Sequence, residues 1–274
     1  METIRKHGFC VLPYANALPL VRYIKEVHAP AELIYRIPRS AVEALLEGVV
    51  EAALIPVVSC FSHPDLAMIP GLGICANGDV TSVLLQCHRP LSEVRVVRLD
   101  PESRTSNHLI QVLMRDHFRI SHPVEYSRCA DEADARVCIG DRALCTAPAV
   151  ETYDLAGEWK KMTGLPFVFA VWAVRRSCSH IEEISEILHR AKDRGCQSLI
   201  ELARLCAQRL GLPADRCYEY LSERLHYEVG PAEYDGMGLF RALAASLVQP
   251  EAPPIVDNKA SHGEGRSTPV QGWS

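Results

Sequence analysis

Two stretches of sequence decide the predicted fold: residues 78–85, which read GDVTSVLL, and residues 100–107, which read DPESRTSN. Each joins an apolar run typical of a strand to a cluster of small hydroxyl side chains, and the second cluster also holds Arg104. Helical spacing of apolar residues follows residue 107, so the second cluster opens a helix. A helix start has free backbone N–H groups and the positive end of the helix dipole, which favour a carboxylate or phosphate. The sequence therefore predicts a cleft that binds a small anion.

Strands and helices alternate through the residues that precede these stretches. Residues 8–12, 33–37 and 52–58 are predicted as strands, and helical spacing occupies residues 20–27 and 40–48. Within the helix predicted at residues 40–48, Ser40 and Glu43 have capping-box spacing, and Gly48 is placed to end the helix. The final strand–helix–strand unit predicts a right-handed crossover and a parallel pair of strands.

The rest of the chain continues the alternation and then becomes helical. Prolines and glycines make residues 59–77 a predicted loop. Further strands are predicted at residues 80–87, 94–99, 124–126, 136–139, 168–174 and 227–229. Apolar stripes at helical spacing occupy most of residues 181–247, whereas residues 249–274 are rich in proline, glycine and charge and predict a disordered tail. This pattern predicts an α/β protein.

Composition excludes several classes of protein. The chain has 274 residues and a net charge of −5 with no basic stripe, so nucleic acid is not expected as a partner. No apolar run approaches the ~20 residues that span a bilayer, and the first residues do not resemble a signal peptide, so we expect a cytoplasmic protein without a membrane partner. The eleven cysteines have no C-x-x-C spacing, which favours buried, reduced thiols over structural zinc or disulfides.

Two polar residues lie where a predicted strand gives way to a helix. Asn16 follows the first strand, where open α/β sheets place ligand groups, but asparagine is also a common turn or cap residue. Asp141 follows the strand at residues 136–139 and either caps a short helix or orients a ligand or an arginine. Local pattern leaves these alternatives open.

Six segments, taken in order, resemble the chorismate dehydratases of the futalosine route to menaquinone. They are YANALPL at 14–20, IPGLGI at 69–74, GDVTSV at 78–83, DPESRTS at 100–106, IGDRAL at 139–144 and TGLPFVFAVW at 163–172. The resemblance runs from about residue 8 to residue 247. Ala15 and Glu51 depart from the family pattern, which often has leucine and usually aspartate there, but neither is at a catalytic position.

The resemblance implies a fold similar to type II periplasmic binding proteins. Two α/β lobes, each a central β-sheet flanked by helices, would enclose a ligand cleft. The chain would cross between lobes near residues 85–90 and 169–174. Lobe 1 would hold residues 1–90 and 175–248, with the C-terminal helices covering its sheet, and lobe 2 would hold residues 91–174 including the return hinge.

The resemblance also implies a reaction: chorismate loses water to give 3-[(1-carboxyvinyl)oxy]benzoate, without a metal or redox cofactor. The chain has no G-x-G-x-x-G and no Walker loop, as this implies. The family's catalytic positions carry over to Asn16 and Ser82, neither of which titrates near neutral pH. We therefore expect a carboxylate of chorismate to take the proton. The residues expected to bind substrate are Thr81, Ser103, Arg104, Thr105, Ser106, Gly140 and Asp141.

Other interpretations compete with this one. Arg104 could form a surface or interlobe salt bridge instead of clamping a carboxylate. The sister family, 1,4-dihydroxy-6-naphthoate synthase, has the same fold, but its motifs fit this chain less well. A non-catalytic protein that binds a small anion could use the same scaffold, although a secreted receptor would carry a leader. The sequence carries no signal for an oligomeric state.

Overall fold

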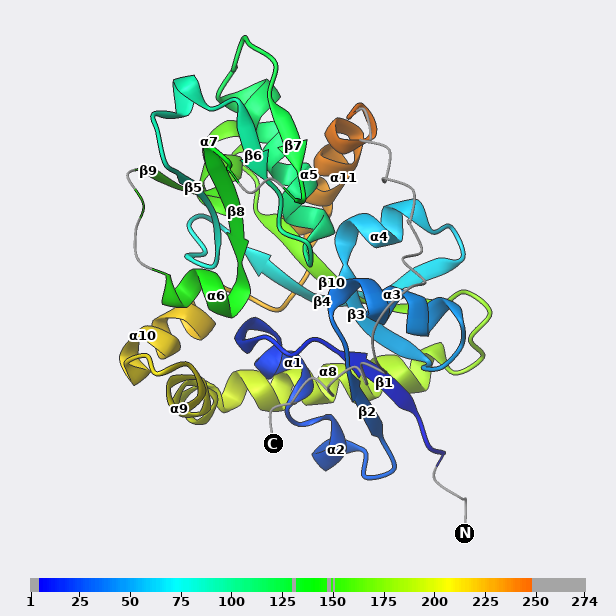
Figure 1. The fold of residues 1–274 in the computed structure, drawn as a ribbon. Coiled ribbons are helices and arrows are strands. Elements are labelled where there is room, and N and C mark those ends of the chain that lie inside the picture. Colours follow the sequence, from blue (N-terminus) through cyan, green and yellow to red (C-terminus); the bar gives the residue numbers. More distant parts are fainter. Residues whose placement is uncertain (1–4, 130–131, 147–148, 150, 248–274) are drawn as a thin grey trace, which may run out of the picture.

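Two five-stranded sheets form the two lobes of the molecule (Figure 1). The computed structural model describes residues 5–129, 132–146, 149 and 151–247, and the tail predicted at residues 249–274 lies outside them. The first sheet has the strand order β2-β1-β3-β10-β4, and the second has the order β7-β6-β8-β5-β9. Helices flank both sheets, so the predicted α/β fold with two lobes is confirmed.

Three short parallel strands begin the first sheet: β1 (Gly8–Val11), β2 (Glu32–Tyr35) and β3 (Ala52–Pro56). Strand β1 lies between the other two and pairs with each in parallel. The predicted direction of β2 and β3 is therefore correct, but they are not direct neighbours, because the crossover between them passes over β1. The connection from β1 to β2 holds η1 (Ala15–Ala17), α1 (Leu18–Val21) and α2 (Ile24–Val27).

The crossover helix α3 (Pro38–Leu46) begins two residues before the predicted capping box. Pro38 stands in its first turn, where the missing N–H of proline breaks no hydrogen bond. Its N-cap is Ile37, which makes no side-chain hydrogen bond, so the capping box at Ser40 is wrong. Gly48 has a φ of 78° and lies just beyond the helix, as predicted for a stop.

The longest strand, β4 (Leu66–Ala76), replaces most of the loop predicted over residues 59–77. Its proline and glycines indicated a loop, but β4 is the edge strand, and an edge tolerates Pro70 because one side needs no donor. Strand β10 (Phe167–Arg175) pairs antiparallel with both β3 and β4. A short helix, α4 (Val57–Ser62), precedes β4.

The chain changes sheets earlier than the sequence indicated. Strand β5 (Val83–Cys87) pairs with β8 and β9 in the second sheet, so the first crossing spans residues 77–82 rather than 85–90. Strand β10 pairs throughout in the first sheet, so the return lies at residues 164–166 rather than 169–174. An apolar run identifies a strand but does not say which of two sheets it joins.

The second lobe consists of the chain between β4 and β10. Its other strands are β6 (Val96–Arg98), β7 (Glu125–Ser127), β8 (Ala135–Ile139) and β9 (Glu151–Asp154). Its helical segments are η2 (Leu91–Glu93), α5 (Arg104–Val112), the π-helical η3 (Leu113–His117), α6 (Gly140–Cys145) and α7 (Leu155–Thr163). Strands β6, β7 and β8 are parallel, and α5 and α7 pack on this sheet.

The C-terminal helices contact both lobes rather than only the first. They are α8 (Ile181–Gln197), α9 (Leu199–Leu210), α10 (Ala214–Glu219), the π-helical η4 (Tyr220–Arg224) and α11 (Pro231–Ala245). Helix α8 packs on α1 and α2, while α11 packs on both β10 and α5. Arg216 of α10 donates to the Leu144 carbonyl of the second lobe at 2.8 Å. The strand predicted at residues 227–229 does not form, and the adjacent His226 makes an isolated bridge to Cys75.

The structure also bears on membrane-spanning helices and on the cysteines, which were both considered from the sequence. Among the described residues, no helix is long and apolar enough to cross a membrane. All eleven cysteines are free thiols, and five of them are buried.

Helix α11 carries two glycines that we expect to respond oppositely to alanine. A Cβ at Gly236 would lie 2.4 Å from the Pro166 carbonyl oxygen, whereas a Cβ at Gly238 would meet no described atom within 4 Å. Overpacking typically costs ~1–3 kcal/mol, and alanine in an open helix gains about 0.5–1 kcal/mol over glycine. We expect urea denaturation to show a lower free energy of unfolding for Gly236→Ala and a higher one for Gly238→Ala. Equal shifts would contradict the packing of α11 on the return hinge.

Candidate active site

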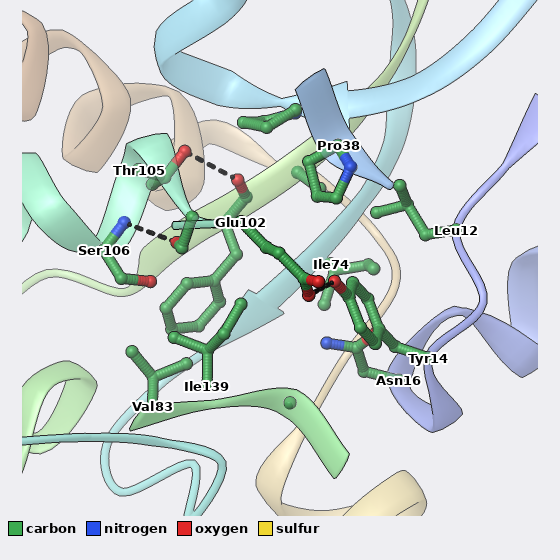
Figure 2. A pocket seen from close by; sticks show the side chains of 15 residues that line it. Leu12, Tyr14, Asn16, Pro38, Ile74, Val83, Glu102, Thr105, Ser106 and Ile139 are labelled. Carbon is green, nitrogen blue, oxygen red and sulfur yellow. Dashed lines mark hydrogen bonds between the residues drawn. The ribbon is translucent and has the colours of Figure 1, made fainter. Parts of the chain in front are cut away.

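A cavity with about 500 Å³ of empty space, counted out to the solvent, lies between the two lobes (Figure 2). Small-molecule sites occur preferentially at interfaces between domains. The first lobe lines it with Leu12, Tyr14, Asn16, Pro38, Pro56, Ile74, Phe169 and Ala170. The second lobe contributes Val83, Glu102, Ser103, Thr105, Ser106, Ile139 and Gly140. Five of the nine predicted site residues are therefore brought together here.

Asn16 enters the cavity from η1, directly after β1. Its Oδ1 atom is buried and meets no hydrogen-bond donor among the described residues. A buried acceptor without a donor is rare in proteins and points to a ligand group that would supply one. The N-cap of η1 is Tyr14, so the alternative role of Asn16 as a cap is not observed.

Asp141 of the second lobe holds the backbone beside Asn16. Its Oδ1 accepts a hydrogen bond from the Ala15 N–H at 2.9 Å, across the boundary between lobes. The N-cap of its own helix, α6, is Ile139, so the predicted capping role is wrong. Burial raises the pKa of the Asp141 carboxyl, and Arg209 partly opposes this shift. Asp141 does not line the cavity but orients a segment that does.

Gly140 connects the predicted catalytic serine to the cavity wall. Its φ is 59°, and its N–H donates to the Ser82 carbonyl oxygen at 2.7 Å. A Cβ at this position would lie 3.4 Å from Cδ1 of Tyr14, so the aromatic ring packs against the glycine. A residue with a side chain would be strained in this backbone conformation.

Ser82 is buried beside the cavity and is not among its lining residues. Its Oγ accepts a hydrogen bond from the Tyr220 hydroxyl at 2.8 Å. Burial raises the pKa of Tyr220, which therefore stays protonated and acts as the donor. Because a hydroxyl can accept and donate at once, the hydrogen of Ser82 is left for another acceptor.

The hydroxyl cluster stands at the start of α5, as predicted. Ser103 is the N-cap, and its Oγ accepts from the Ser106 N–H at 3.1 Å. Thr105 donates through Oγ1 to the Phe169 carbonyl of β10 at 3.2 Å, which links the two lobes. All three hydroxyl residues line the cavity. Arg104 does not; burial lowers the pKa of its guanidinium, and the charges of Arg128 and Arg39 add to that shift.

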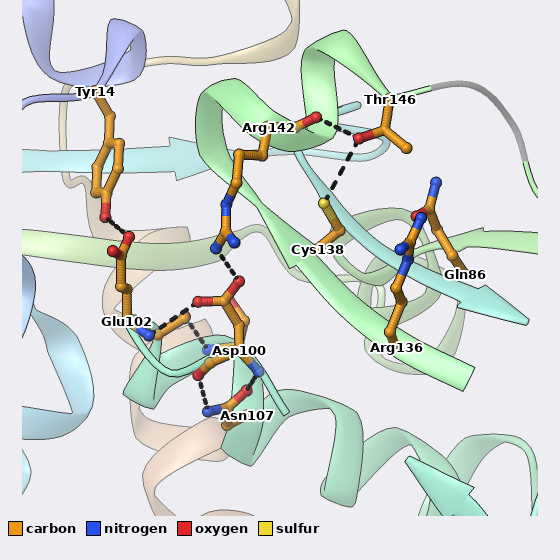
Figure 3. Close-up of polar contacts among 11 residues, drawn as sticks. Tyr14, Gln86, Asp100, Glu102, Asn107, Arg136, Cys138, Arg142 and Thr146 are labelled. Carbon is orange, nitrogen blue, oxygen red and sulfur yellow. Dashed lines mark hydrogen bonds and ion pairs between the residues drawn. The ribbon is translucent and has the colours of Figure 1, made fainter. Parts of the chain in front are cut away.

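Glu102 and Tyr14 form a contact that the sequence did not indicate. The Tyr14 hydroxyl donates to Glu102 Oε2 at 2.6 Å, from the first lobe to the second, inside the cavity (Figures 2 and 3). Burial and the Glu102 carboxylate raise the pKa of Tyr14, so its hydroxyl remains a donor. Glu102 lies within the quoted stretch 100–107, and its carboxylate beside the hydroxyl cluster was the available signal.

The turn that carries Glu102 is fixed by Asp100 (Figure 3). The Asp100 carboxylate accepts from the Glu102 N–H at 2.9 Å and pairs with Arg142 at 2.6 Å. Asn107 closes the turn, because its side chain donates to the Asp100 carbonyl and accepts from the Asp100 N–H. The 100–107 stretch is thus held rigidly at the cavity.

Thr81, the last predicted site residue, lies outside the cavity lining. It has a φ of 62°, and its N–H donates to the carboxylate of Asp154 at 2.6 Å. Its position suggests a role in the turn before Ser82 rather than direct contact with a ligand. Asp154 was not singled out from the sequence.

The chain matches a protein-family model described as menaquinone biosynthesis over residues 10–246. A chorismate dehydratase from Thermus thermophilus is 30% identical over 263 residues, which cover 88% of this chain and 94% of that protein. Both matches span the lobes and the cavity between them.

Two solved structures share the fold. A protein from Archaeoglobus fulgidus has a TM-score of 0.67 at 15% identity, over 88% of this chain and 97% of its own. A Candida albicans protein described as having the generic periplasmic-binding-protein fold has a TM-score of 0.58 at 9% identity, over 90% and 92%. At these identities the likeness concerns the fold alone, and it confirms the predicted periplasmic-binding-protein-like architecture.

Proposed function

Because this chain belongs to the menaquinone biosynthesis family, with a chorismate dehydratase among its relatives, we propose that it removes water from chorismate in the cavity between its lobes. It is then a carbon–oxygen hydro-lyase whose product is 3-[(1-carboxyvinyl)oxy]benzoate. The observation that carries this proposal to the site is the Oδ1 of Asn16 in the cavity wall, which is buried and meets no hydrogen-bond donor in the described part of the chain. The cytoplasm is the compartment we propose for this biosynthetic step.

The substrate supplies much of the driving force. The ring proton beside the enol ether of chorismate is acidified by the conjugated ring carboxylate. Loss of the neighbouring hydroxyl then makes the ring aromatic. The protein must hold a dianion in one orientation and steer which bond breaks, because chorismate can also lose its enolpyruvyl group or rearrange. Orientation of this kind can contribute ~7–11 kcal/mol in favourable cases.

We assign the proton transfer to a carboxylate of chorismate itself. Asn16 and Ser82 carry side chains that do not titrate near neutral pH, so neither is a natural base. Asn16 Oδ1 would accept from a substrate hydroxyl or orient the enolpyruvyl group. The Ser82 hydroxyl, which already accepts from Tyr220, would hydrogen-bond the departing oxygen, which leaves as water with the proton that the substrate carboxylate has taken.

The start of α5 would bind the other carboxylate. Ser103 and Ser106 would donate their hydroxyl hydrogens there, because that of Thr105 already goes to the Phe169 carbonyl, and the helix dipole favours a negative charge. Arg104 is the first residue of the same helix and adds positive charge, although its side chain stands outside the cavity lining. Its contribution would therefore be electrostatic attraction rather than a bidentate clamp.

Product analysis tests the function. Purified protein mixed with chorismate, without added metal or cofactor, should give an aromatic product that is lighter by one water and retains the enolpyruvyl group. Mass and ultraviolet spectrum identify it. Unchanged chorismate with folded protein would contradict the proposal and favour 1,4-dihydroxy-6-naphthoate synthase or a binding protein. Thermal shifts with other small carboxylates would then separate those two.

A further inference from the structure

The turn that leads into Ser82 has an unusual backbone. Gly78 has a φ of 130° and Thr81 a φ of 62°. The left-handed region suits glycine, but it is unfavourable for a β-branched residue such as threonine. Such a conformation persists only where surrounding groups hold it, and it is often found at functional sites. The turn is also the first crossing between lobes, so its geometry sets where Ser82 stands.

The carboxylate of Asp154 holds this turn with one oxygen and a helix with the other. Oδ2 accepts from the N–H groups of Val80 at 2.9 Å and Thr81 at 2.6 Å. Oδ1 accepts from the N–H groups of Ala156 and Gly157, both at 3.1 Å, which makes Asp154 the N-cap of α7. One side chain thus joins the crossing to a helix of the second lobe.

Packing confirms that the turn sits directly on the start of α7. A Cβ at Gly157 would lie 1.8 Å from Asp79 Oδ1 and 3.0 Å from Asp79 Cγ, so a side chain there would force the Asp79 carboxylate to move. Beyond the turn, the Ser82 carbonyl accepts from Gly140, and its hydroxyl accepts from Tyr220. Ser82 is therefore held through its carbonyl and its hydroxyl once the turn before it is fixed.

We propose that Asp154 is a positioning residue for the dehydration reaction, because it holds Thr81 in the left-handed conformation that places Ser82. The proposal rests on the proposed function of Ser82. Asp154 itself does not line the cavity, and its effect passes through the backbone of the crossing. The charge of the carboxylate suits this role, since charge-assisted hydrogen bonds to backbone N–H groups are stronger than neutral ones.

The two oxygens allow the two roles of Asp154 to be separated. Serine is about as good an N-cap as aspartate, but its shorter side chain has one oxygen and cannot also reach the turn. Asp154→Ser therefore keeps the cap of α7 and releases Val80 and Thr81. We expect kcat for chorismate to fall at least about tenfold, with KM changed by less than about twofold, as for loss of an interaction used in the transition state.

Asp134 provides a matched control in the same lobe. Its carboxylate also accepts from two backbone N–H groups, those of Arg95 at 2.8 Å and Val96 at 3.0 Å, but it does not line the cavity. We expect Asp134→Ser to shift the melting temperature by a similar amount and to leave kcat unchanged. A fall in kcat in both variants would mean that general destabilisation is the cause, and would overturn the positioning role.

A rescue experiment completes the test. Glycine adopts a positive φ without strain, so a Thr81→Gly background needs less support from Asp154. We expect Asp154→Ser to lower kcat less than about threefold when compared with Thr81→Gly alone. An equal loss in both backgrounds, or wild-type kcat in Asp154→Ser, would overturn the positioning role while dehydration by the wild type stands. Wild-type protein that leaves chorismate unchanged would overturn the proposed function and this role together.

Discussion

Replacing Asn16 by alanine is expected to lower kcat for chorismate dehydration by about 100- to 1,000-fold, the loss typical of removing one preorganised polar group from an active site. The side chain ends in a buried Oδ1 that meets no described donor, inside the cavity between the lobes. An acceptor held in this way needs no reorganisation when the substrate arrives. Steady-state kinetics measures the effect, and a melting temperature near that of the wild type shows that the variant is folded.

Asn16→Asp separates two mechanisms at the same position. If a carboxylate of chorismate takes the proton, an aspartate adds negative charge near a dianion, and activity should stay below wild type without a new pH dependence. An aspartate that acts as a better base would instead raise the activity about tenfold or more and introduce a new pH dependence. That second result would contradict the substrate-assisted elimination.

Glu102→Gln is expected to lower the KM for chorismate by about tenfold and to keep kcat. Glu102 is the carboxylate among the fifteen residues that line the cavity, and the substrate brings two more. Two like charges about 5 Å apart repel by roughly 3 kcal/mol at an effective dielectric of about 20, and a tenfold change in affinity is only about 1.4 kcal/mol. Glutamine keeps an acceptor for the Tyr14 hydroxyl, so the contact between lobes survives.

Tyr14→Phe is the matched control for Glu102→Gln. Phenylalanine removes the donor to Glu102 but leaves the carboxylate charge in the cavity, so KM should rise rather than fall.

A different result for Glu102→Gln would contradict the charge explanation. Loss of more than about 100-fold in kcat for this variant, at unchanged KM, would identify Glu102 as the proton acceptor. Isothermal titration with the product would show whether affinity follows KM in each variant.

Local pattern was sufficient for the parts of the site that a single strand–turn–helix unit builds. The hydroxyl cluster at the start of α5 and the place of Asn16 after β1 are of this kind, since the spacing of apolar residues and small hydroxyls identifies each unit. The expectation that both face one cleft came from the resemblance to a family, and the structure places Asn16, Ser103, Thr105 and Ser106 in the wall of one cavity.

Contacts between distant residues could not be predicted in the same way. Tyr14 and Glu102 are 88 residues apart, and Thr81 and Asp154 are 73 apart. Tyrosine in a turn and aspartate before a helix are ordinary residues, and only the fold of the whole chain gives them these partners. Asp141 illustrates the same limit, because its helix offered a local role as a cap and the structure uses it for Ala15 instead.

The edge strand β4 shows how tertiary position can override local propensity. Pro70 and two glycines within it indicated a loop, yet β10 on one side and backbone hydrogen bonds to residues 226–229 on the other keep it extended. The lobe boundaries differ from expectation for a related reason. An apolar segment could be buried in either sheet, so the strands with which it pairs decide which lobe it joins. That pairing depends on the fold of the whole chain.

The central place of β10 in the first sheet sets an order of assembly during synthesis. Strand β10 separates β3 from β4, and in the described part of the chain β4 pairs with no other strand of this sheet. The first sheet therefore stays open until residue 175 has left the ribosome, whereas the strands of the second lie together in residues 83–154. Because chains fold from the N-terminus as they emerge, the lobe that is begun first is finished last.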